Sequence, residues 1–478
     1  MKLSEYIELD GLGLAELIRK REVKGAEVLA CAQRMVESIN PRINAVIETY
    51  AEPLAGSDDP AAPFTGVPFV TKDLVLHAAG QKMELGSRLA RGLVFPHDTD
   101  LMARFRRAGL RTVGRTTSPE FGYCPTTENV LHGPTRNPWD TTRSPGGSSG
   151  GSGSAVAAGI VPLAHASDGG GSIRIPAACC GLVGLKPTRA RTPIGPDAAE
   201  GLNGLGIEFA VTRSVRDCAA LLDAVQGAGL GDPYVAPQPT CSYTEAVSRR
   251  HERLHIAVMG TAWGGQETDP EVLEGVSKTV RQCEASGHTV TEAAPALDWD
   301  EFVSTTMVYW TANLAAWIDQ VATTVGRSID ASTLEATTLA CYRYGQTLKA
   351  TDLLHAMDVA NRIRRSFAAF FDRYDVLLTP TLPAPPARLG TVDANDSSLD
   401  AEGWTRQVFG FTPFTPVFNT TGQPAISLPL VRTGGGLPIG MQFVGRFGAE
   451  DVLINLAAQL ERSMPWPRVA PLALAAAA

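Results

Sequence analysis

The sequence predicts an α/β fold, and two observations support this prediction. Apolar residues at helical spacing alternate along the chain with short apolar runs, which is the pattern of helices layered on a sheet. The chain is 478 residues long and 44% hydrophobic, so it can bury a large core. By the usual domain size this length allows two to four domains, but large α/β folds often form one, so length alone does not fix the number.

The predicted elements follow from local patterns in chain order. Helical spacing predicts helices over about 3–19 and 26–39, and Pro41 is expected to end the second because proline disrupts a helix. The apolar run 66–70 predicts a short strand that leads to Lys72 at a turn. The later predicted elements are a helix over 99–108, a strand over 111–114, helices over 155–159 and 214–225, a strand over 255–259, helices over 270–285, 301–322, 331–348 and 352–371, strands over 375–380, 425–431 and 439–444, and a helix over 450–462.

Residues 144–186 are unusually rich in glycine, serine and alanine. The segment contains Ser-Pro-Gly-Gly-Ser-Ser-Gly-Gly-Ser-Gly-Ser over 144–154 and Asp-Gly-Gly-Gly-Ser-Ile-Arg-Ile-Pro over 168–176. A flexible linker has such a composition, but this segment runs into a helix-forming series at 155–158 and is followed by an apolar stretch. We therefore expect the glycines to let the backbone approach a ligand or another segment closely.

Charge and composition exclude several classes of partner. The formal net charge is −8 and there is no Lys/Arg run, which argues against nucleic acid or an anionic membrane. No run approaches the roughly 18 apolar residues that span a bilayer. The first ten residues also lack the pattern of a secretory signal, so a cytoplasmic location is expected. A small molecule is the expected partner.

The cysteines and histidines predict neither a metal site nor a cofactor. Eight cysteines are scattered along the chain, and we interpret them as reduced thiols. The one close pair, Cys179 and Cys180, is adjacent and lacks the Cys-x-x-Cys spacing of redox and zinc sites. The eight histidines are also dispersed, with no His-x-x-x-His or His-Glu-x-x-His motif.

The second glycine-rich loop has the composition of a nucleophile loop. The amides of Gly169, Gly170 and Gly171 can converge on one point and hold an oxyanion, which makes Ser172 a candidate nucleophile. A serine nucleophile needs a base, and His165 is expected to satisfy a local hydrogen bond instead. No Gly-x-Ser-x-Gly elbow, phosphate-binding P-loop or dinucleotide-binding motif surrounds these residues.

Several long motifs resemble those of the amidase signature family. The resemblance rests on the segments 66–73 (Gly-Val-Pro-Phe-Val-Thr-Lys-Asp), 135–139, 145–152 (Pro-Gly-Gly-Ser-Ser-Gly-Gly-Ser), 168–177, 180–188 and 419–429, with Gly440. It covers most of the chain. It implies one amidase signature domain over 1–478 with a large, mixed, twisted β-sheet flanked by helices. Within it the resemblance implies an N-terminal helical region over 1–65, a catalytic core over 66–225 and a variable substrate-pocket region over 300–410.

The resemblance also implies a set of catalytic roles. Ser172 is expected to form the acyl-enzyme, Ser148 to act as a bridging serine held by a cis peptide, and Lys72 to be the base. A base must be neutral, so burial must lower the pKa of Lys72 from about 10.4 towards neutrality. Asp168 and Arg174 flank the nucleophile and are expected to support the loop rather than react.

The sequence departs from the family pattern at two positions near the nucleophile. Gly169 stands where a residue with a side chain is frequent, and Ala166 stands where glycine is frequent. The first departure is expected to loosen the oxyanion loop, because glycine costs more entropy to order. Neither removes a catalytic group.

The substrate is expected to be an amide bound in an apolar pocket. Over 135–140, 187–195 and 414–429 the chain is most similar to family members that hydrolyse nylon oligomers, with aryl acylamidases as a related group. The expected pocket residues are Gly122, Tyr123, Cys124, Ile194, Met307, Tyr309 and Trp310. For the three residues of the 301–322 helix, a place in the core is equally open. Such a pocket favours hydrophobic or aryl amides and linear or cyclic oligoamides, and the same chemistry would open esters and carbamates (urethanes).

Two other functions stay open at this point. The chain could be the A-type subunit of a glutamine-dependent amidotransferase, which predicts a tight hetero-complex and glutaminase activity. It could also be an inactive binding scaffold, but the presence of Lys72, Ser148 and Ser172 together speaks against this. A hydrolase of small amides is expected to be a monomer or homodimer.

Overall fold

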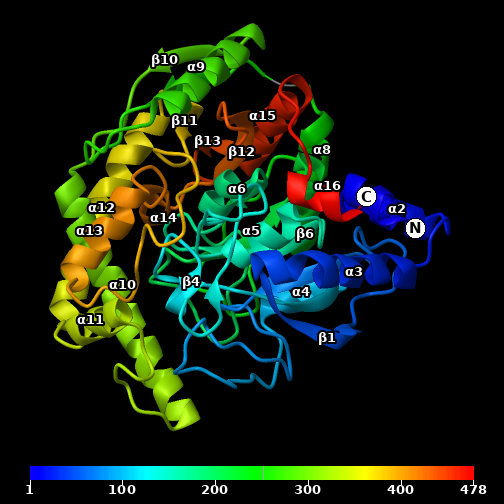
Figure 1. Cartoon of the computed structure of the whole chain (residues 1–478). Helices are drawn as coiled ribbons and strands as arrows, with labels where there is room; N and C mark the ends of the chain where they lie inside the picture. Colours follow the sequence, from blue (N-terminus) through cyan, green and yellow to red (C-terminus); the bar gives the residue numbers. More distant parts are fainter. Residues whose placement is uncertain (251, 478) are drawn as a thin grey trace.

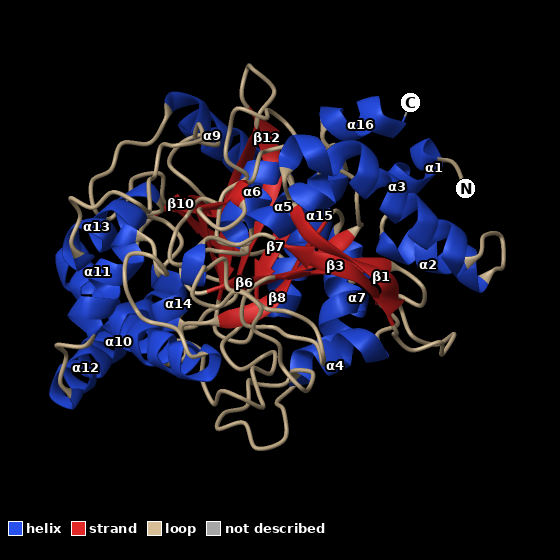
Figure 2. Cartoon of the chain, turned by 60° about the horizontal axis from the view of Figure 1, so that its bottom comes forward, coloured by secondary structure: helices blue, strands red, loops and turns tan. Residues whose placement is uncertain are grey.

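An eight-stranded mixed β-sheet forms the centre of the molecule in the computed structural model, which describes residues 1–250 and 252–477 (Figure 2). Three strands at one end run parallel, and the pairings of the remaining strands are antiparallel. The strand order is β10 (Thr289–Glu292), β9 (His255–Val258), β11 (Val376–Pro380), β13 (Pro438–Gly445), β12 (Ala425–Arg432), β7 (Val183–Lys186), β8 (Ile207–Thr212) and β6 (Leu163–Asp168). The predicted α/β class with a large mixed sheet is confirmed.

A smaller sheet lies beside the end of the large one. In it, β3 (Arg111–Thr116) pairs antiparallel with β1 (Val46–Leu54) and parallel with β2 (Pro68–Lys72). Strand β2 packs against β6, the last strand of the large sheet. This packing carries the end of β2, and therefore Lys72, into the interior. A further ribbon of two short strands is formed by β4 (Glu128–Asn129) and β5 (Gly133–Pro134).

Helices surround both sheets in three groups (Figure 1). Near the two termini lie α1 (Leu3–Glu8), α2 (Gly11–Arg19), α3 (Gly25–Ile43) and α16 (Pro471–Ala477). Against the sheets pack α4 (Asp100–Arg107), α5 (Gly150–Ala157), α6 (Arg174–Cys180), α7 (Val215–Val225), α9 (Pro270–Ala285) and α15 (Glu450–Ser463). Helix α8 (Tyr243–Ser248) packs on α7 and α15, and a short 3-10 helix lies at Glu120–Gly122. The opposite side is covered by α10 (Trp299–Val325), α11 (Ala336–Gly345), α12 (Ala350–Phe371), α13 (Ala401–Phe411) and α14 (Val417–Thr421).

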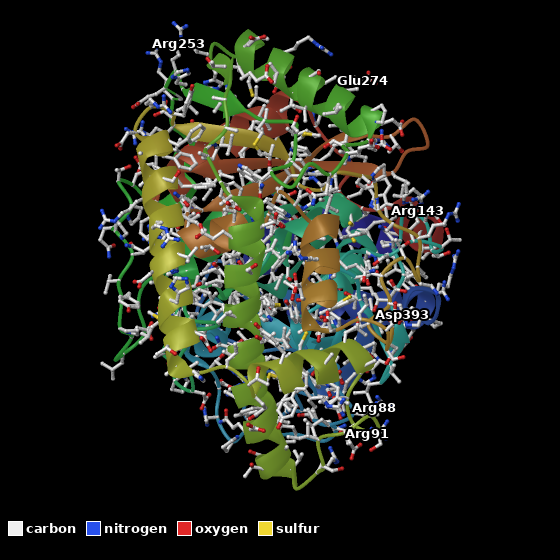
Figure 3. All side chains as sticks on the ribbon, turned by 90° about the vertical axis from the view of Figure 1, so that its left-hand side faces the viewer. Arg88, Arg91, Arg143, Arg253, Glu274 and Asp393 are labelled. Carbon is white, nitrogen blue, oxygen red and sulfur yellow. The ribbon has the colours of Figure 1, made fainter. Side chains whose placement is uncertain are left out.

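The helices α10–α13 form a layer with its own apolar core. Their buried residues pack with Phe121, Leu377 and Val444 into one cluster, while the main sheet and the N-terminal helices share a second, larger cluster. Charged side chains such as Arg253 and Glu274 lie at the outline of the molecule (Figure 3). None of the helices in the described ranges combines the length and the apolarity that a membrane crossing requires.

Two of the predicted boundaries in the N-terminal region are wrong. The expected helix over 3–19 is divided at Leu9 and Asp10, where the Asp10 carboxylate accepts a hydrogen bond from Gly13 N and caps a new helix. The helix expected to stop at Pro41 instead continues to Ile43. Pro41 lies in the last turn, so only one backbone hydrogen bond is lost there, and Asn44 ends the helix in the left-handed conformation.

Candidate active site

A cavity of about 70 Å³ lies against the apolar cluster of the α10–α13 layer, which supplies Leu74, Phe121, Trp310 and Leu314 to its lining. Its polar wall contains Ser148, Ser167, Asp168, Ser172 and Glu208. The remaining lining residues are apolar or glycine: Leu74, Val75, Phe121, Gly122, Gly169, Ile194, Gly201, Leu202, Gly206, Ile207, Trp310, Leu314 and Trp317. The cavity is therefore a small apolar chamber with its hydroxyl groups gathered on one wall.

Lys72 lies behind this hydroxyl-bearing wall. Its side chain is fully buried, and Nζ donates to Ser148 Oγ at 2.7 Å and to Ser167 Oγ at 2.9 Å. Burial lowers the pKa of Lys72 to about 7, because the charged ammonium loses its hydration, although the negative charges of Glu208 and Asp168 oppose this effect. A substantial fraction of this amine is therefore neutral at physiological pH and able to accept a proton.

Ser148 is held in the tight loop that precedes α5. The Gly147–Ser148 peptide bond is cis, and the Ser148 side chain is buried. Glycine is required at 147, because a Cβ there would lie 2.5 Å from the Thr126 carbonyl oxygen. Gly122 (φ 73°) faces the same hydroxyl, since a Cβ at 122 would lie 3.3 Å from Ser148 Oγ. The two glycines thus let the backbone pack closely around Ser148, with no side chain in between.

Ser172 lies in the turn between β6 and α6, where Asp168 organises the backbone. Its carboxylate accepts hydrogen bonds from Gly171 N (2.7 Å) and Ile173 N (3.1 Å). It also pairs with Arg174, whose Nε and Nη2 donate at 2.9 and 2.8 Å. Burial alone would raise the pKa of Asp168, but the Arg174 guanidinium holds it well below its usual range. The carboxylate is therefore committed to shaping the turn.

Arg174 extends this network to distant parts of the chain. It donates to the Thr415 carbonyl (2.8 Å), to Gln442 Oε1 (2.8 Å) and to Asn419 Oδ1 (2.7 Å). Asn419 Nδ2 in turn donates to Asp168. Asn419 and Gln442 were not predicted as site residues, although Asn419 opens one of the motifs that carry the family resemblance.

The three glycine amides of the predicted oxyanion loop do not all face the cavity. The Gly171 N–H donates to Asp168, so it is occupied. Among the hydrogen bonds of the described residues, none uses the amides of Gly169 or Gly170 as donors to a protein acceptor. An aspartate three residues before an amide is well placed to capture it, a competition that the glycine pattern does not reveal.

The structure brings only part of the predicted pocket to the cavity. Gly122, Ile194 and Trp310 line it, whereas Tyr123, Cys124, Met307 and Tyr309 do not. Tyr123 stacks on Trp310 with ring centroids 4.4 Å apart, so it supports the wall from behind. Phe121, at the start of the segment 121–125 that was expected to form the acyl-side wall, also lines the cavity. The lining residues Leu74, Leu202 and Trp317 were missed, because their apolar side chains carry no chemical signal in the sequence.

The other predicted pocket residues belong to the core. Cys124 is buried near Thr126, and burial raises the pKa of its thiol to about 12. Met307 is buried in the cluster of the α10–α13 layer. Tyr309 packs with Leu205, Ala356 and Ala360. Residues 309 and 310 are adjacent on one helix, so their side chains point in directions about 100° apart. Trp310 therefore faces the chamber while Tyr309 packs in the core.

Trp310 explains the unusual glycine at 169. A Cβ on Gly169 would lie 3.0 Å from Trp310 Cζ2 and 2.8 Å from Leu202 Cδ1. A larger residue at 169 would therefore need both side chains to move. Glycine at 169, which departs from the family pattern, therefore leaves room for the indole ring of Trp310.

His165 makes the local hydrogen bond expected of it. Its Nδ1 accepts from the backbone N–H of Lys72 at 3.3 Å. Its Nε2 lies 3.6 Å from Glu208 Oε2, on the neighbouring strand β8. Glu208 is buried, and its Oε1 has no hydrogen-bond partner among the described residues. No motif or spacing in the sequence indicated this cavity-lining carboxylate.

Comparison with known proteins shows which family this chain resembles over most of its length. A model of the Amidase family matches residues 27–454. The 6-aminohexanoate-cyclic-dimer hydrolase of Pseudomonas sp. (strain NK87) is 36% identical over 96% of this chain and 95% of that protein. The enzyme of the same name from Paenarthrobacter ureafaciens is 35% identical over the same shares.

Solved structures show the same relationship. The structure of a 6-aminohexanoate cyclic dimer hydrolase superposes with a TM-score of 0.92 at 33% identity, covering 98% of this chain and 99% of that one. A bacterial aryl acylamidase has the same fold, with a TM-score of 0.82 at 24% identity, and the match covers 98% of both chains. Since the family model spans most of the sequence and the relatives align over nearly their whole length, this chain belongs to the amidase signature family and is an amidase, a hydrolase of carbon–nitrogen bonds.

Proposed function

We propose that the protein hydrolyses amides through an acyl-enzyme formed on Ser172, with Ser148 as a proton bridge and Lys72 as the base. The observation that supports this most directly is the 2.7 Å hydrogen bond between Lys72 Nζ and Ser148 Oγ, on the wall that also holds Ser172. Burial keeps a large share of the lysine neutral near pH 7, which is the form that a general base requires.

In the proposed reaction, one proton is transferred to Lys72 and later returned to the leaving amine. Ser172 loses its proton to Ser148 as Ser148 passes its own proton to Lys72, and the Ser172 oxygen attacks the substrate carbonyl. The amides of Gly169 and Gly170 are available to donate to the resulting oxyanion. The C–N bond then breaks, and the proton returns through Ser148 to the leaving amine. Water hydrolyses the ester at Ser172 by the same relay.

The proposed substrates are hydrophobic amides with a slim acyl group. The chamber of about 70 Å³ has apolar walls formed by Trp310, Trp317 and Phe121. An unbranched methylene chain would bury its surface against these side chains beside Ser172. This supports linear or cyclic oligoamides of the nylon type, and two relatives are named as hydrolases of the 6-aminohexanoate cyclic dimer. Aryl amides, esters and carbamates with the same acyl group are proposed as further substrates.

The proposal is tested with a panel of p-nitroanilides of increasing acyl length, a cyclic and a linear 6-aminohexanoate oligomer, and a p-nitrophenyl ester and carbamate. The parent is expected to cleave the unbranched members, and Ser172→Ala to cleave none. Intact mass measurement during turnover of the ester should reveal an acyl adduct on the parent. The exposed Ser277→Ala variant serves as a control that retains full activity.

Two results would contradict the proposal. Activity that survives Ser172→Ala would exclude the serine mechanism. Inactivity of the parent on every member would favour the amidotransferase subunit if ammonia is released from glutamine in the presence of a partner extract, and the binding scaffold if it is not. Sedimentation of the purified protein tests the expected monomer or homodimer.

A further inference from the structure

Three side chains with the donors of a metal site lie next to the cavity wall and take no part in the amidase chemistry. His77 and His97 come from the long connection between β2 and α4, and Asp197 comes from the connection between β7 and β8. Their ligand atoms all lie within 4.8 Å of one another. Asp197 Oδ2 lies 3.0 Å from His97 Nε2 and 3.2 Å from His77 Nε2. Ligands bound to zinc at about 2.0–2.2 Å with tetrahedral angles are about 3.3–3.5 Å apart, so only small shifts are needed.

His77 is oriented as a metal-binding histidine. It is 5% exposed, and its Nδ1 faces the Val75 carbonyl oxygen at 3.3 Å. A carbonyl can only accept, so this hydrogen bond places the proton on Nδ1 and leaves the lone pair on Nε2. Nε2 is buried and makes no aligned hydrogen bond with any described residue. A second ring nitrogen bound to a backbone carbonyl is the usual support of a metal-ligating imidazole.

The surroundings hold the three ligands in place from two sides. The His77 ring stacks on Phe95, with centroids 4.0 Å apart and planes 17° from parallel. Backbone hydrogen bonds join the loops that carry the ligands: Thr99 N donates to the His77 carbonyl, Gly80 N to the Phe95 carbonyl and Asp100 N to the Gly195 carbonyl. The ligand positions are therefore fixed by the fold and do not depend on an ion to assemble them.

The opposite side of the group is open to solvent. The side chains of His97 and Asp197 are 43% and 45% exposed, so an ion can enter and retain water in its remaining positions. Two imidazoles and one carboxylate, with an open position, form a donor set that suits zinc and related divalent transition metals, and it is unsuited to calcium or magnesium.

We propose that His77, His97 and Asp197 bind one Zn²⁺ ion, with water completing its coordination. The ion cross-links the loop that carries Val75 to the loop that carries Ile194, and both residues line the active-site chamber. Zinc is thus a structural clamp on the substrate wall. It does not contact Ser172 or Lys72 in this proposal.

Calorimetric titration of the chelator-treated, dialysed protein with ZnCl₂ tests the proposal without substrate. The parent is expected to bind one equivalent and to melt at a higher temperature with zinc than without it. Cobalt bound in the same place should show the visible absorption of a tetrahedral site. His97→Ala and Asp197→Asn should each weaken zinc binding by at least about tenfold, since even supporting residues of metal sites contribute this much. The exposed His355→Ala is the matched control and should bind like the parent.

Zinc binding that is absent from the parent, or that is unchanged in both His97→Ala and Asp197→Asn, would overturn the proposal. A measurement on the parent itself avoids any dependence on how the variants fold. Zinc should slow the modification of His97 by diethyl pyrocarbonate but leave that of His355 unaffected, as followed by peptide mass mapping. Equal rates with and without zinc would contradict the site. Because none of these measurements involves turnover, they are independent of the proposed amidase mechanism.

Discussion

At the scale of single residues, the most consequential feature is the buried amine of Lys72. Burial lowers its pKa to about 7, so the amine is mostly neutral above this pH and mostly charged below it. If Lys72 is the base, kcat/KM should rise with pH through about 7 and fall about tenfold per pH unit on the acid side. A pH–rate profile of a neutral amide measures this limb, and a profile that is flat between pH 5 and 9 would contradict the assignment.

Glu208 should set the position of that limb. Its negative charge favours the charged form of Lys72 and so raises the lysine's pKa against the effect of burial. The near-isosteric Glu208→Gln should therefore shift the acid limb to lower pH and leave kcat/KM on the plateau within a few-fold. The exposed Glu284→Gln should leave the profile unchanged. A shift to higher pH would show that the glutamate acts in another way, for example by holding the substrate.

Replacement of Lys72 should lower the activity of the enzyme and raise its stability. Lys72→Met is expected to lower kcat/KM by about 100-fold to 10,000-fold, the usual contribution of a general base. It should also raise the free energy of unfolding by up to about 2 kcal/mol, because the variant no longer buries an amine. The folded lysine has the lower pKa, so the parent loses stability as pH falls from about 10.4 to about 7, while the variant does not. Urea unfolding at pH 7 and pH 10 measures the difference.

At the scale of elements, the nucleophile turn and α10 fit together where Gly169 meets Trp310. Gly169→Ala should force Trp310 and Leu202 to move, because its Cβ would lie within 3.0 Å of both. We expect kcat/KM for the preferred substrate to fall about tenfold, which corresponds to about 1.4 kcal/mol. Trp310→Ala should widen the chamber and favour bulkier acyl groups.

The double variant decides whether the two positions act together. If Gly169 exists to accommodate Trp310, Gly169→Ala should cost much less activity in the Trp310→Ala background, and a double-mutant cycle measures this coupling. Tyr309→Phe is the matched control, since Tyr309 lies on the same helix but packs away from the chamber. Strict additivity of the two effects would contradict the pairing.

The sequence predicted most of the outer elements and the strand that leads to Lys72, but it missed three other strands that frame the site. The helices over 270–285 and 352–371 were found because they are long and have one polar face. Strands β6, β7 and β8 were missed: they are buried on both faces, so they show no alternation, and β6 is rich in small and polar residues. Ser167 on β6 was overlooked for the same reason, although it contacts Lys72.

The side chains proposed to react could be selected from the sequence more easily than the residues that line the chamber. Lys72, Ser148 and Ser172 stand in long motifs whose residue types are tied to a reaction, and the structure gathers them around one chamber. Lining residues such as Leu202 and Trp317 only need to be apolar and to reach the chamber. The path of the chain decides which apolar residues reach it, and the spacing of residues in the sequence does not reveal that path. The group of His77, His97 and Asp197 could not be predicted either, because only the fold brings these distant residues together.

At the scale of the whole molecule, the buried network around Asp168 and Arg174 joins the nucleophile turn to the C-terminal strands. Arg174→Ala would leave the Asp168 carboxylate buried without its cation, which typically costs about 3–5 kcal/mol of stability. For a chain of this length, we expect a melting temperature lowered by roughly 3–5 °C, together with a large loss of activity. The exposed Arg253→Ala is the control. A variant as stable as the parent would show that the network is not a structural support.

The same network also affects the order of events when the protein is made. All three proposed catalytic side chains lie within residues 72–172, but Asn419 and Gln442, which hold Arg174 and through it the turn of Ser172, are synthesised much later. A nascent chain that has not yet reached residue 442 would thus carry its serine in a turn that lacks these supports. The Ser172 turn would gain its full set of hydrogen bonds only after both residues have been made.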